Sequence, residues 1–437
     1  MRCLRPGAPR APLAALLLSV AALLAGGCGI TGAAATSSGS ASSLNGIGPI
    51  TFAIGKLGTG SYLPGLIDEW NRDNPRQRVT LIQLPDDEDE QLAQLVANLQ
   101  ARSDVYDVMG LDVIWTAEFA SNGWIIPLRQ KLFPLGDFLR PAVDTAIYQR
   151  TLWAVPWTSN AELLYYRRDI LRRAGVRPPQ TWAQLAILAK TVAPRFGLWG
   201  YAGQFQAYEG LTVNFAEGVQ SAGGSIMSAD GTRVTVDSPQ AREALAFLVS
   251  GFREGWIPKA ALGYDEAASQ DAFEQGKLLF LNNWPYVYGA ASTPGPGNEV
   301  AGKFGVEALP GPDGPGSSTL GGWNLAISAF SRHQATALKF IRFLTSLPAE
   351  RQALIDGSQP PVWTQLYAEP SLIRQFPYLP VLKQTILSAE LRPAVPEYNQ
   401  LSLAISSSVH QALLLRKPVN ATITDLSGEL NQVIGHG

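Results

Sequence analysis

Apolar runs alternate with stretches of helical periodicity along most of the chain. Ile50–Ile54 and Val79–Leu84 are short apolar runs bounded by Gly, Asn and Pro, and apolar residues recur at helical spacing between them, which is typical of a βαβ unit. A helix from about Asp86 and a buried parallel strand at Val108–Trp115 are expected next. Further strands are predicted at Leu152–Trp157, Leu163–Tyr166, Lys277–Leu281, Phe304–Leu309 and Asn324–Ser328, and helices at Trp182–Val192, Gln240–Glu254, Gln334–Ser346 and Pro348–Leu354. The pattern predicts an α/β fold with a helix-rich end.

The first residues have the pattern of a secretory signal. Three arginines precede an apolar run, Pro12–Ala25, that ends in small residues before Cys28. We expect cleavage after residue 27 and lipidation of Cys28, as in a bacterial lipoprotein. An ordinary signal peptide with an incidental cysteine is the alternative, since Ala25 stands where such lipid-attachment motifs usually have Leu.

A tether and a soluble globule are expected after Cys28. Gly29–Gly46 is almost wholly Gly, Ala, Ser and Thr, which cannot bury enough apolar area to order itself. No later stretch is as apolar as a membrane span. The predicted protein is therefore extracytoplasmic and touches the membrane only through its lipid anchor.

Composition excludes several classes of function. With 34 basic and 36 acidic residues the formal net charge is −2, so no excess positive charge favours nucleic-acid binding. Three histidines and two cysteines argue against metal sites built from clustered nitrogen and sulfur ligands, and no nucleotide-binding or esterase motif is present. We expect no metal and no cofactor.

An acidic run, residues 86–90, admits two interpretations. It supplies carboxylates that calcium could use, but no central glycine and no closing acidic residue follow at the spacing of a calcium loop. Acidic residues are also favoured at the start of a helix by the helix dipole. We prefer the second interpretation.

Several sequence blocks, in order, resemble the solute-binding proteins of bacterial ABC importers for oligosaccharides, most closely the trehalose/maltose-binding branch and its actinobacterial trehalose-binding lipoproteins. The blocks span most of the chain after Cys28. They are Asp107–Trp115 with Phe119 and Gly123–Trp124, Ala154–Asn160, Leu164–Arg167, Tyr208–Gly210, Ser221–Gly224, Phe273–Gly276, Asn283–Tyr286, Leu320–Asn324 and Arg392–Pro393.

The resemblance implies a two-lobe, periplasmic-binding-protein-like fold with a hinge between the lobes and a ligand cleft. In such proteins the chain crosses between the lobes more than once. We therefore expect a signal peptide at residues 1–27, the lipidated cysteine and tether at 28–47, lobe one at 48–157 and 300–345, and lobe two at 158–299 and 346–437.

Sugar binding requires groups that donate and accept hydrogen bonds, with aromatic faces for the C–H surfaces of the rings. Asp112 follows a strongly apolar strand, and the carboxyl ends of strands line the usual crevice of open α/β sheets. It is expected to accept from a sugar hydroxyl, or else to cap the helix that begins near Thr116. Asn160 is either a turn residue or a ligand, and the resemblance favours the ligand.

The resemblance assigns five more positions. Glu266 matches an acidic ligand of the family, although alone it reads as a solvated helix residue. Trp284 and Trp323 are the expected stacking platforms, or else core residues, and Gly322 allows close backbone approach. Arg392 matches an Arg-Pro ligand whose guanidinium can hold two oxygens, or it is a surface charge pair.

Two further positions qualify the assignment. Gln91 falls where the family has a polar or basic ligand on the second helix. Gly55–Gly60 contains Lys56 and no carboxylate, although relatives carry an acidic ligand there, so trehalose cannot be assumed. Lys56 would recognise an anionic sugar or lie in solvent.

Two functions remain open. The first is capture of a disaccharide or small oligosaccharide (trehalose/maltose-like or an amino sugar) by closure of the lobes, without catalysis, and delivery by a monomer to a permease and an ATPase on separate chains. The alternative is an extracellular glycoside hydrolase that uses Asp112 and Glu266. For a receptor, we expect Trp284→Ala and Arg392→Ala each to weaken binding about tenfold or more and to preserve the fold.

Overall fold

The computed structural model describes residues 44, 46–55 and 62–435. Its first sheet has the strand order β2-β1-β3-β11-β6. β1 pairs in parallel with both β2 and β3, whereas β11 is antiparallel to β3 and β6. The predicted βαβ unit and the predicted buried parallel strand are thus confirmed. The bounds are β1 (Ile50–Ile54), β2 (Val79–Gln83), β3 (Val108–Asp112), β6 (Val155–Ala161) and β11 (Leu320–Ile327).

The second sheet has the order β10-β7-β9-β8. β7 is antiparallel to both β10 and β9, and β8 is parallel to β9. Only Glu162 separates β6 of the first sheet from β7 of the second, so the chain passes directly from one sheet to the other. The bounds are β7 (Leu163–Arg167), β8 (Trp199–Ala202), β9 (Leu278–Asn283) and β10 (Phe304–Glu307), and β4 (Ile147–Tyr148) with β5 (Thr151–Leu152) forms a separate hairpin.

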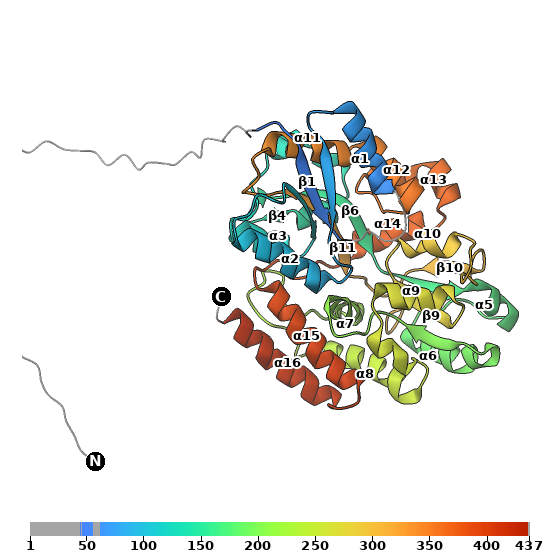
Figure 1. Cartoon of the computed structure of the whole chain (residues 1–437). Helices are drawn as coiled ribbons and strands as arrows, with labels where there is room; N and C mark the ends of the chain where they lie inside the picture. Colours follow the sequence, from blue (N-terminus) through green and yellow to red (C-terminus); the bar gives the residue numbers. More distant parts are fainter. Residues whose placement is uncertain (1–43, 45, 56–61, 436–437) are drawn as a thin grey trace, which may run out of the picture. The chain divides into compact units, whose positions relative to one another are not determined.

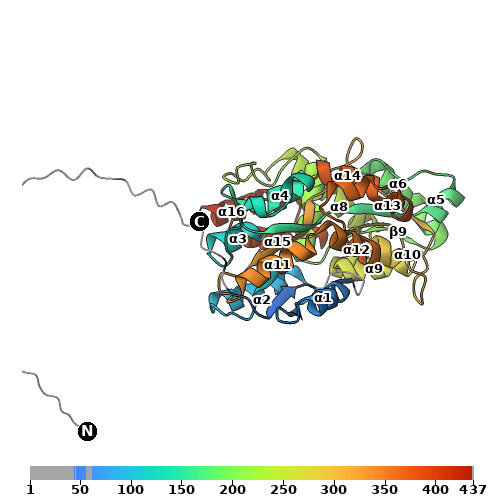
Figure 2. The ribbon, with the colours of Figure 1, turned by 90° about the horizontal axis from the view of Figure 1, so that it is seen from above.

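Helices cover both sheets. α1 (Tyr62–Asp73) packs against α11 (Gln334–Leu344) and α12 (Leu347–Gly357), which run beside it in Figures 1 and 2. α7 (Glu209–Ser221) packs against α8 (Pro239–Glu254) and α15 (Tyr398–Leu413), and α16 (Val419–Ile434) lies on α15. The other helices are α2 (Glu88–Gln100), α3 (Thr116–Ser121), α4 (Arg140–Thr145), α5 (Arg168–Ala174), α6 (Trp182–Thr191), α9 (Glu266–Glu274), α10 (Val287–Ser292), α13 (Pro370–Gln375) and α14 (Leu379–Ser388), with short 3₁₀ turns η1 (Gln130–Leu132), η2 (Leu135–Asp137), η3 (Ala193–Phe196), η4 (Lys259–Gly263) and η5 (Thr364–Ala368).

Most predicted elements are present, and the differences have physical causes. The run predicted at Leu152–Trp157 divides between β5 and β6, and β11 begins four residues before the expected Asn324. α7 was not predicted. Nearly all of its residues are buried, polar ones such as Glu209, Asn214 and Glu217 included, so its polar positions do not mark a solvent-exposed face.

Three elements, β10, α12 and α14, pack with the sheet of the other lobe from the one to which the predicted boundaries assign them. β10, expected in lobe one, pairs with β7 in the second sheet. α12 and α14, expected in lobe two, pack on α1 and β6 of the first sheet's layer. The spacing of apolar residues indicates that a strand or helix is buried, but it does not indicate against which sheet that element packs. The remaining boundaries stay a prediction.

None of the helices within the described ranges combines the length and the apolar character that crossing a bilayer demands.

Candidate functional site

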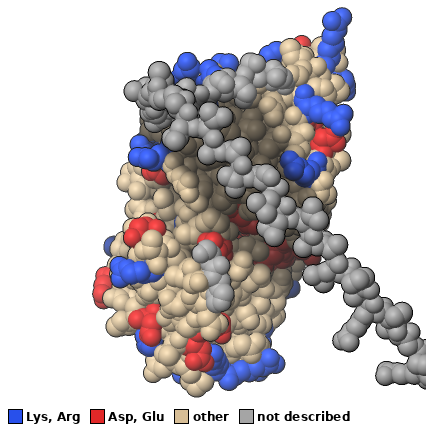
Figure 3. All heavy atoms as spheres, turned by 90° about the vertical axis from the view of Figure 1, so that its left-hand side faces the viewer, with Lys and Arg blue, Asp and Glu red and all other residues tan. Residues whose placement is uncertain are grey.

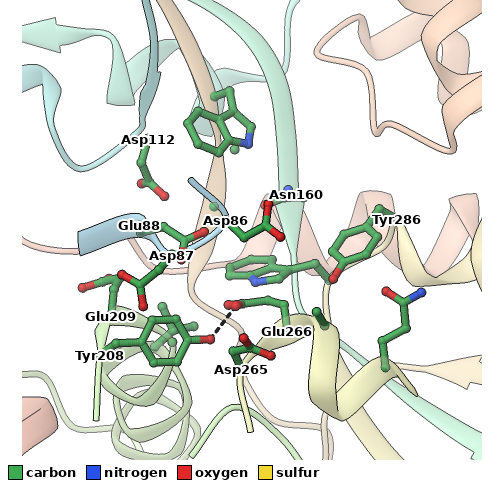
Figure 4. A pocket seen from close by; sticks show the side chains of 18 of the residues that line it. Asp86, Asp87, Glu88, Asp112, Asn160, Tyr208, Glu209, Asp265, Glu266 and Tyr286 are labelled. Atoms are coloured by element: carbon green, nitrogen blue, oxygen red, sulfur yellow. Dashed lines mark hydrogen bonds between the residues drawn. The ribbon is translucent and has the colours of Figure 1, made fainter. Parts of the chain in front are cut away.

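A cavity of about 260 Å³ is lined by residues of the first sheet and by residues of helices and segments that adjoin the second sheet. The first sheet contributes the ends of β3 and β6 and the start of β11. The other side comes from the beginnings of α7 and α9 and the segment after β9, as the close view in Figure 4 shows. Strand ends and helix starts meet here because the connecting loops of α/β units emerge at the same edge of a sheet.

The structure brings seven of the eight sugar-site candidates together in the lining of this cavity. The eighth, Gln91, does not line it. Gln91 is 1% exposed, and its amide nitrogen donates to the Asp86 carbonyl at 3.2 Å. Glu88, the first residue of α2, lines the cavity, whereas Gln91, about one turn further along the same side of the helix, is buried and does not line it. The seven are Asp112, Asn160, Glu266, Trp284, Gly322, Trp323 and Arg392.

Arg392 joins the two sides of the cavity through carboxylates. Its guanidinium donates to Asp112 Oδ1 at 3.0 Å and to Glu209 Oε1 at 2.6 Å, and its side chain is only 3% exposed. It is therefore not a surface charge pair. Glu209 also accepts from the hydroxyl of Tyr398 at 2.8 Å and from that of Ser402. Two of the guanidinium's nitrogens thus already bind protein carboxylates, while its Nε is buried without a partner among the described residues.

Asp112 is the last residue of β3, at the predicted sheet edge. Its Oδ1 accepts from the backbone N–H of Ile114 at 3.1 Å as well as from Arg392. The residue at the N-cap of α3 is Trp115, which makes no side-chain capping bond. Asp112 therefore does not cap that helix. Burial raises the pKa of Asp112, although the charge of Arg392 acts to lower it.

Glu266 begins α9, where the preceding Asp265 caps the helix by accepting from the N–H of Ala268 at 2.7 Å. The Glu266 carboxyl accepts a hydrogen bond of 2.5 Å from the Tyr208 hydroxyl, drawn as the dashed line in Figure 4. Burial raises the pKa of Glu266 to about 7, against the lowering effect of that bond. Glu266 is thus a cavity residue and not a solvated helix residue.

Trp284 and Trp323 line the cavity and are half-buried, unlike core tryptophans such as Trp157 at 1% exposure. The ring of Trp323 stands edge-on to that of Trp115, with centroids 6.2 Å apart and planes at 81°. An aromatic face of this kind can pack on the C–H surface of a sugar ring.

Two glycines of β11, Gly321 and Gly322, allow the Trp284 ring and strand β6 to approach the backbone of β11 closely. A Cβ on Gly321 would lie 2.6 Å from the Trp284 ring and 2.4 Å from Asn160 Oδ1. Gly322 has φ +133°, and a Cβ there would lie 2.2 Å from the Thr158 carbonyl oxygen. The close approach that Gly322 permits is therefore to strand β6.

Sequence reasoning missed most of the acidic lining. Asp87 caps α2 by accepting from the N–H groups of Asp89 and Glu90, which agrees with the helix-start interpretation of the acidic run. The first three residues of the run, Asp86–Glu88, also line the cavity, which the spacing of the run could not reveal. Within the described part of the chain, no group of three or more His, Cys, Asp or Glu could hold a metal ion. The other missed lining residues with polar side chains are Tyr208, Glu209, Asp265, Gln270, Asp271, Tyr286 and Gln359, of which Tyr208, Glu209 and Tyr286 lie in blocks already noted in the sequence.

Three expectations fall outside the described residues: the signal peptide, the lipidated Cys28 and the role of Lys56. They stay predictions.

The family of the chain follows from comparison with known proteins. Residues 55–350 match the family described as bacterial extracellular solute-binding protein. The chain belongs to this family. A probable ABC transporter-binding protein of Deinococcus radiodurans is 32% identical over 407 residues, which cover 89% of this chain and 94% of the relative. These solute-binding proteins include a mannitol-binding protein of Pseudomonas aeruginosa, 24% identical over 349 residues, which cover 73% of this chain and 78% of that protein.

The solved structure of maltose-bound MalE3 of T. maritima shares the fold of this solute-binding protein. Its TM-score is 0.83 at 33% identity, and the match covers 88% of this chain and 99% of that one. The predicted α/β, periplasmic-binding-protein-like fold is confirmed.

Proposed function

We propose that this solute-binding protein captures a disaccharide or small oligosaccharide, trehalose- or maltose-like or an amino sugar, and delivers it to an ABC permease. The observation that carries the proposal is the cavity in which two half-buried indoles, an amide and several carboxyls come together from the first sheet and from elements that adjoin the second. Flat apolar faces beside hydrogen-bonding groups suit a ligand with C–H and O–H surfaces. The maltose bound by the similar MalE3 is such a ligand.

Closure would follow from contacts on both sides of the cavity. A ligand that touches Trp323 on β11 and Glu266 on α9 at once binds the closed arrangement more tightly than an open one, and this difference shifts the population toward closure. The permease and ATPase would be separate chains. Lipidation at Cys28 would keep the protein, as a monomer, at the outer face of the membrane.

The second candidate function is glycoside hydrolysis by Asp112 and Glu266. It is favoured by one observation, the pKa of about 7 at Glu266, because a general acid needs to be protonated near the working pH. Against it, Asp112 is held by Arg392 and by the backbone of Ile114, which leaves less of its carboxyl to act on substrate.

A single experiment separates the two functions. Purified protein is incubated with trehalose, maltose and cellobiose, and both the melting temperature and released monosaccharide are measured. A rise in melting temperature without cleavage is the result expected of a receptor, whereas sustained release of monosaccharide would establish the hydrolase. Trp284→Ala should reduce the rise at a given sugar concentration, and Trp199→Ala, at a position 51% exposed outside the cavity, should not.

A further inference from the structure

The described residues that line the cavity carry far more negative than positive groups. They include eight carboxylates and one guanidinium, that of Arg392. Arg392 is bound to Asp112 and Glu209, so its charge is directed at those two carboxylates. On the face drawn in Figure 3, a patch of acidic atoms also lies near mid-height, while Lys and Arg lie chiefly toward the two ends.

Among the eight carboxylates that line the cavity, Glu88 is the one with a buried oxygen that has no hydrogen-bond partner in the described structure. It is the first residue of α2, its Oε2 is buried, and that oxygen has no hydrogen-bond partner. Burial raises the pKa of Glu88 well above its usual range, and the charges of Glu266 and Asp112 raise it further. In Figure 4, Glu88 and Asp112 face Glu266 and Asp265 across the same space.

A second acceptor in the lining also lacks a donor. Asn160 Oδ1 is buried without a partner among the described residues. An ammonium group has three donors and no acceptor, so it can serve a carboxylate and an amide oxygen at once, whereas each hydroxyl of a neutral sugar brings one donor. Charge-assisted hydrogen bonds of this kind are also stronger than neutral ones.

We propose that the ligand is a saccharide with a protonated amino group, and that Glu88, opposite Glu266, receives this group. The inference rests on the proposed function and makes it narrower. A neutral ligand would exclude water from these carboxylates without offsetting their charge, which is unfavourable. A metal ion does not fit as the counter-charge, because the described carboxylates form no group that could hold one.

The test uses matched pairs of ligands on the full-length protein. Trehalose, maltose and cellobiose are each titrated by calorimetry beside the analogue in which one hydroxyl is replaced by an amine, and beside the N-acetylated and N-sulfated forms of that amine. In each set that binds, the amine should bind at least about tenfold more tightly than the neutral members, and the N-sulfate most weakly. Equal affinity for amine and neutral members, or tightest binding of the N-sulfate, would overturn the inference and leave the sugar receptor intact. Binding by no member of any set would overturn both.

Variants assign the group to Glu88. Glu88→Gln keeps the size of the side chain and removes its charge. It should therefore weaken binding of the amine about tenfold or more and change the affinity for the neutral sugar less than about twofold. The control Glu254→Gln, on the exposed pair with Lys190, should change neither affinity. If Glu88→Gln lowers the affinity for the amine and for the neutral sugar equally, or lowers neither affinity, the assignment is wrong. A melting-temperature rise with calcium chloride alone, lost in Glu88→Gln, would instead assign these carboxylates to a cation site and overturn the proposal.

Discussion

Replacement of Arg392 by Met should destabilise the protein strongly. The side chain is 3% exposed and its guanidinium binds Asp112 and Glu209, whose side chains are 13% and 5% exposed. Met preserves most of the apolar stem but leaves two buried carboxylates without their counter-charge. Removal of one partner from a buried ion pair typically costs about 3–5 kcal/mol, and we expect a loss of this order in the free energy of unfolding.

The loss should depend on pH, and its sign can be worked out. Without Arg392, burial should raise the pKa of both carboxyls further, since that guanidinium acts to lower each of them in the parent protein. Groups that hold protons more tightly in the folded state than in the unfolded state make stability fall as pH rises. The deficit of Arg392→Met should therefore be smaller near pH 5 than near pH 8.

Urea titration followed by tryptophan fluorescence measures this loss. Lys190→Met is the control, because its 2.9 Å pair with Glu254 is about half exposed, and its removal should cost less than about 1 kcal/mol. Adding Asp112→Asn and Glu209→Gln to Arg392→Met should recover part of the loss. A loss below about 1 kcal/mol for Arg392→Met, or a deficit that grows toward low pH, would refute the reasoning. The sequence alone led us to expect that removal of Arg392 preserves the fold. Because Arg392 is buried between two carboxylates, we now expect its removal to destabilise the fold.

Three further substitutions test other features. Gly321→Ala places a Cβ 2.6 Å from the Trp284 ring, so it should weaken sugar binding about tenfold in calorimetry; unchanged affinity would show that the ring's position is unimportant. Trp284→Ala should weaken binding by a similar factor through loss of ring contact, with the melting temperature of the free protein as control for the fold. Glu350 is 2% exposed and burial raises its pKa well above the usual range, so stability should fall as pH rises past the unfolded pKa. Glu350→Gln should gain about 1 kcal/mol or more relative to the parent between pH 5 and pH 8, and parallel pH profiles would contradict this.

The site was only partly predictable from the sequence. Asp112 could be placed because it directly follows an apolar strand, and Trp284 and Arg392 because their blocks resemble a family. Nothing in the sequence indicated that Arg392 and Glu209, 183 positions apart, bind each other. The packing of α2, whose first residue meets the cavity, also decided that Glu88 lines it and that Gln91 does not.

The sequence by itself determined the α/β alternation, most strand positions and the positions of some helices, such as α6, α8 and α11, because each depends on a short period of apolar residues along the chain. It also determined that carboxyl, amide, guanidinium and indole side chains are present that can bind a sugar. Only the tertiary structure decided which sheet received β10, which acidic residues share the cavity, and which carboxylates Arg392 neutralises. These three outcomes depend on contacts between residues far apart in the sequence. Such contacts, together with burial, set the charge state and the partners of each carboxyl, and the local sequence pattern does not contain this information.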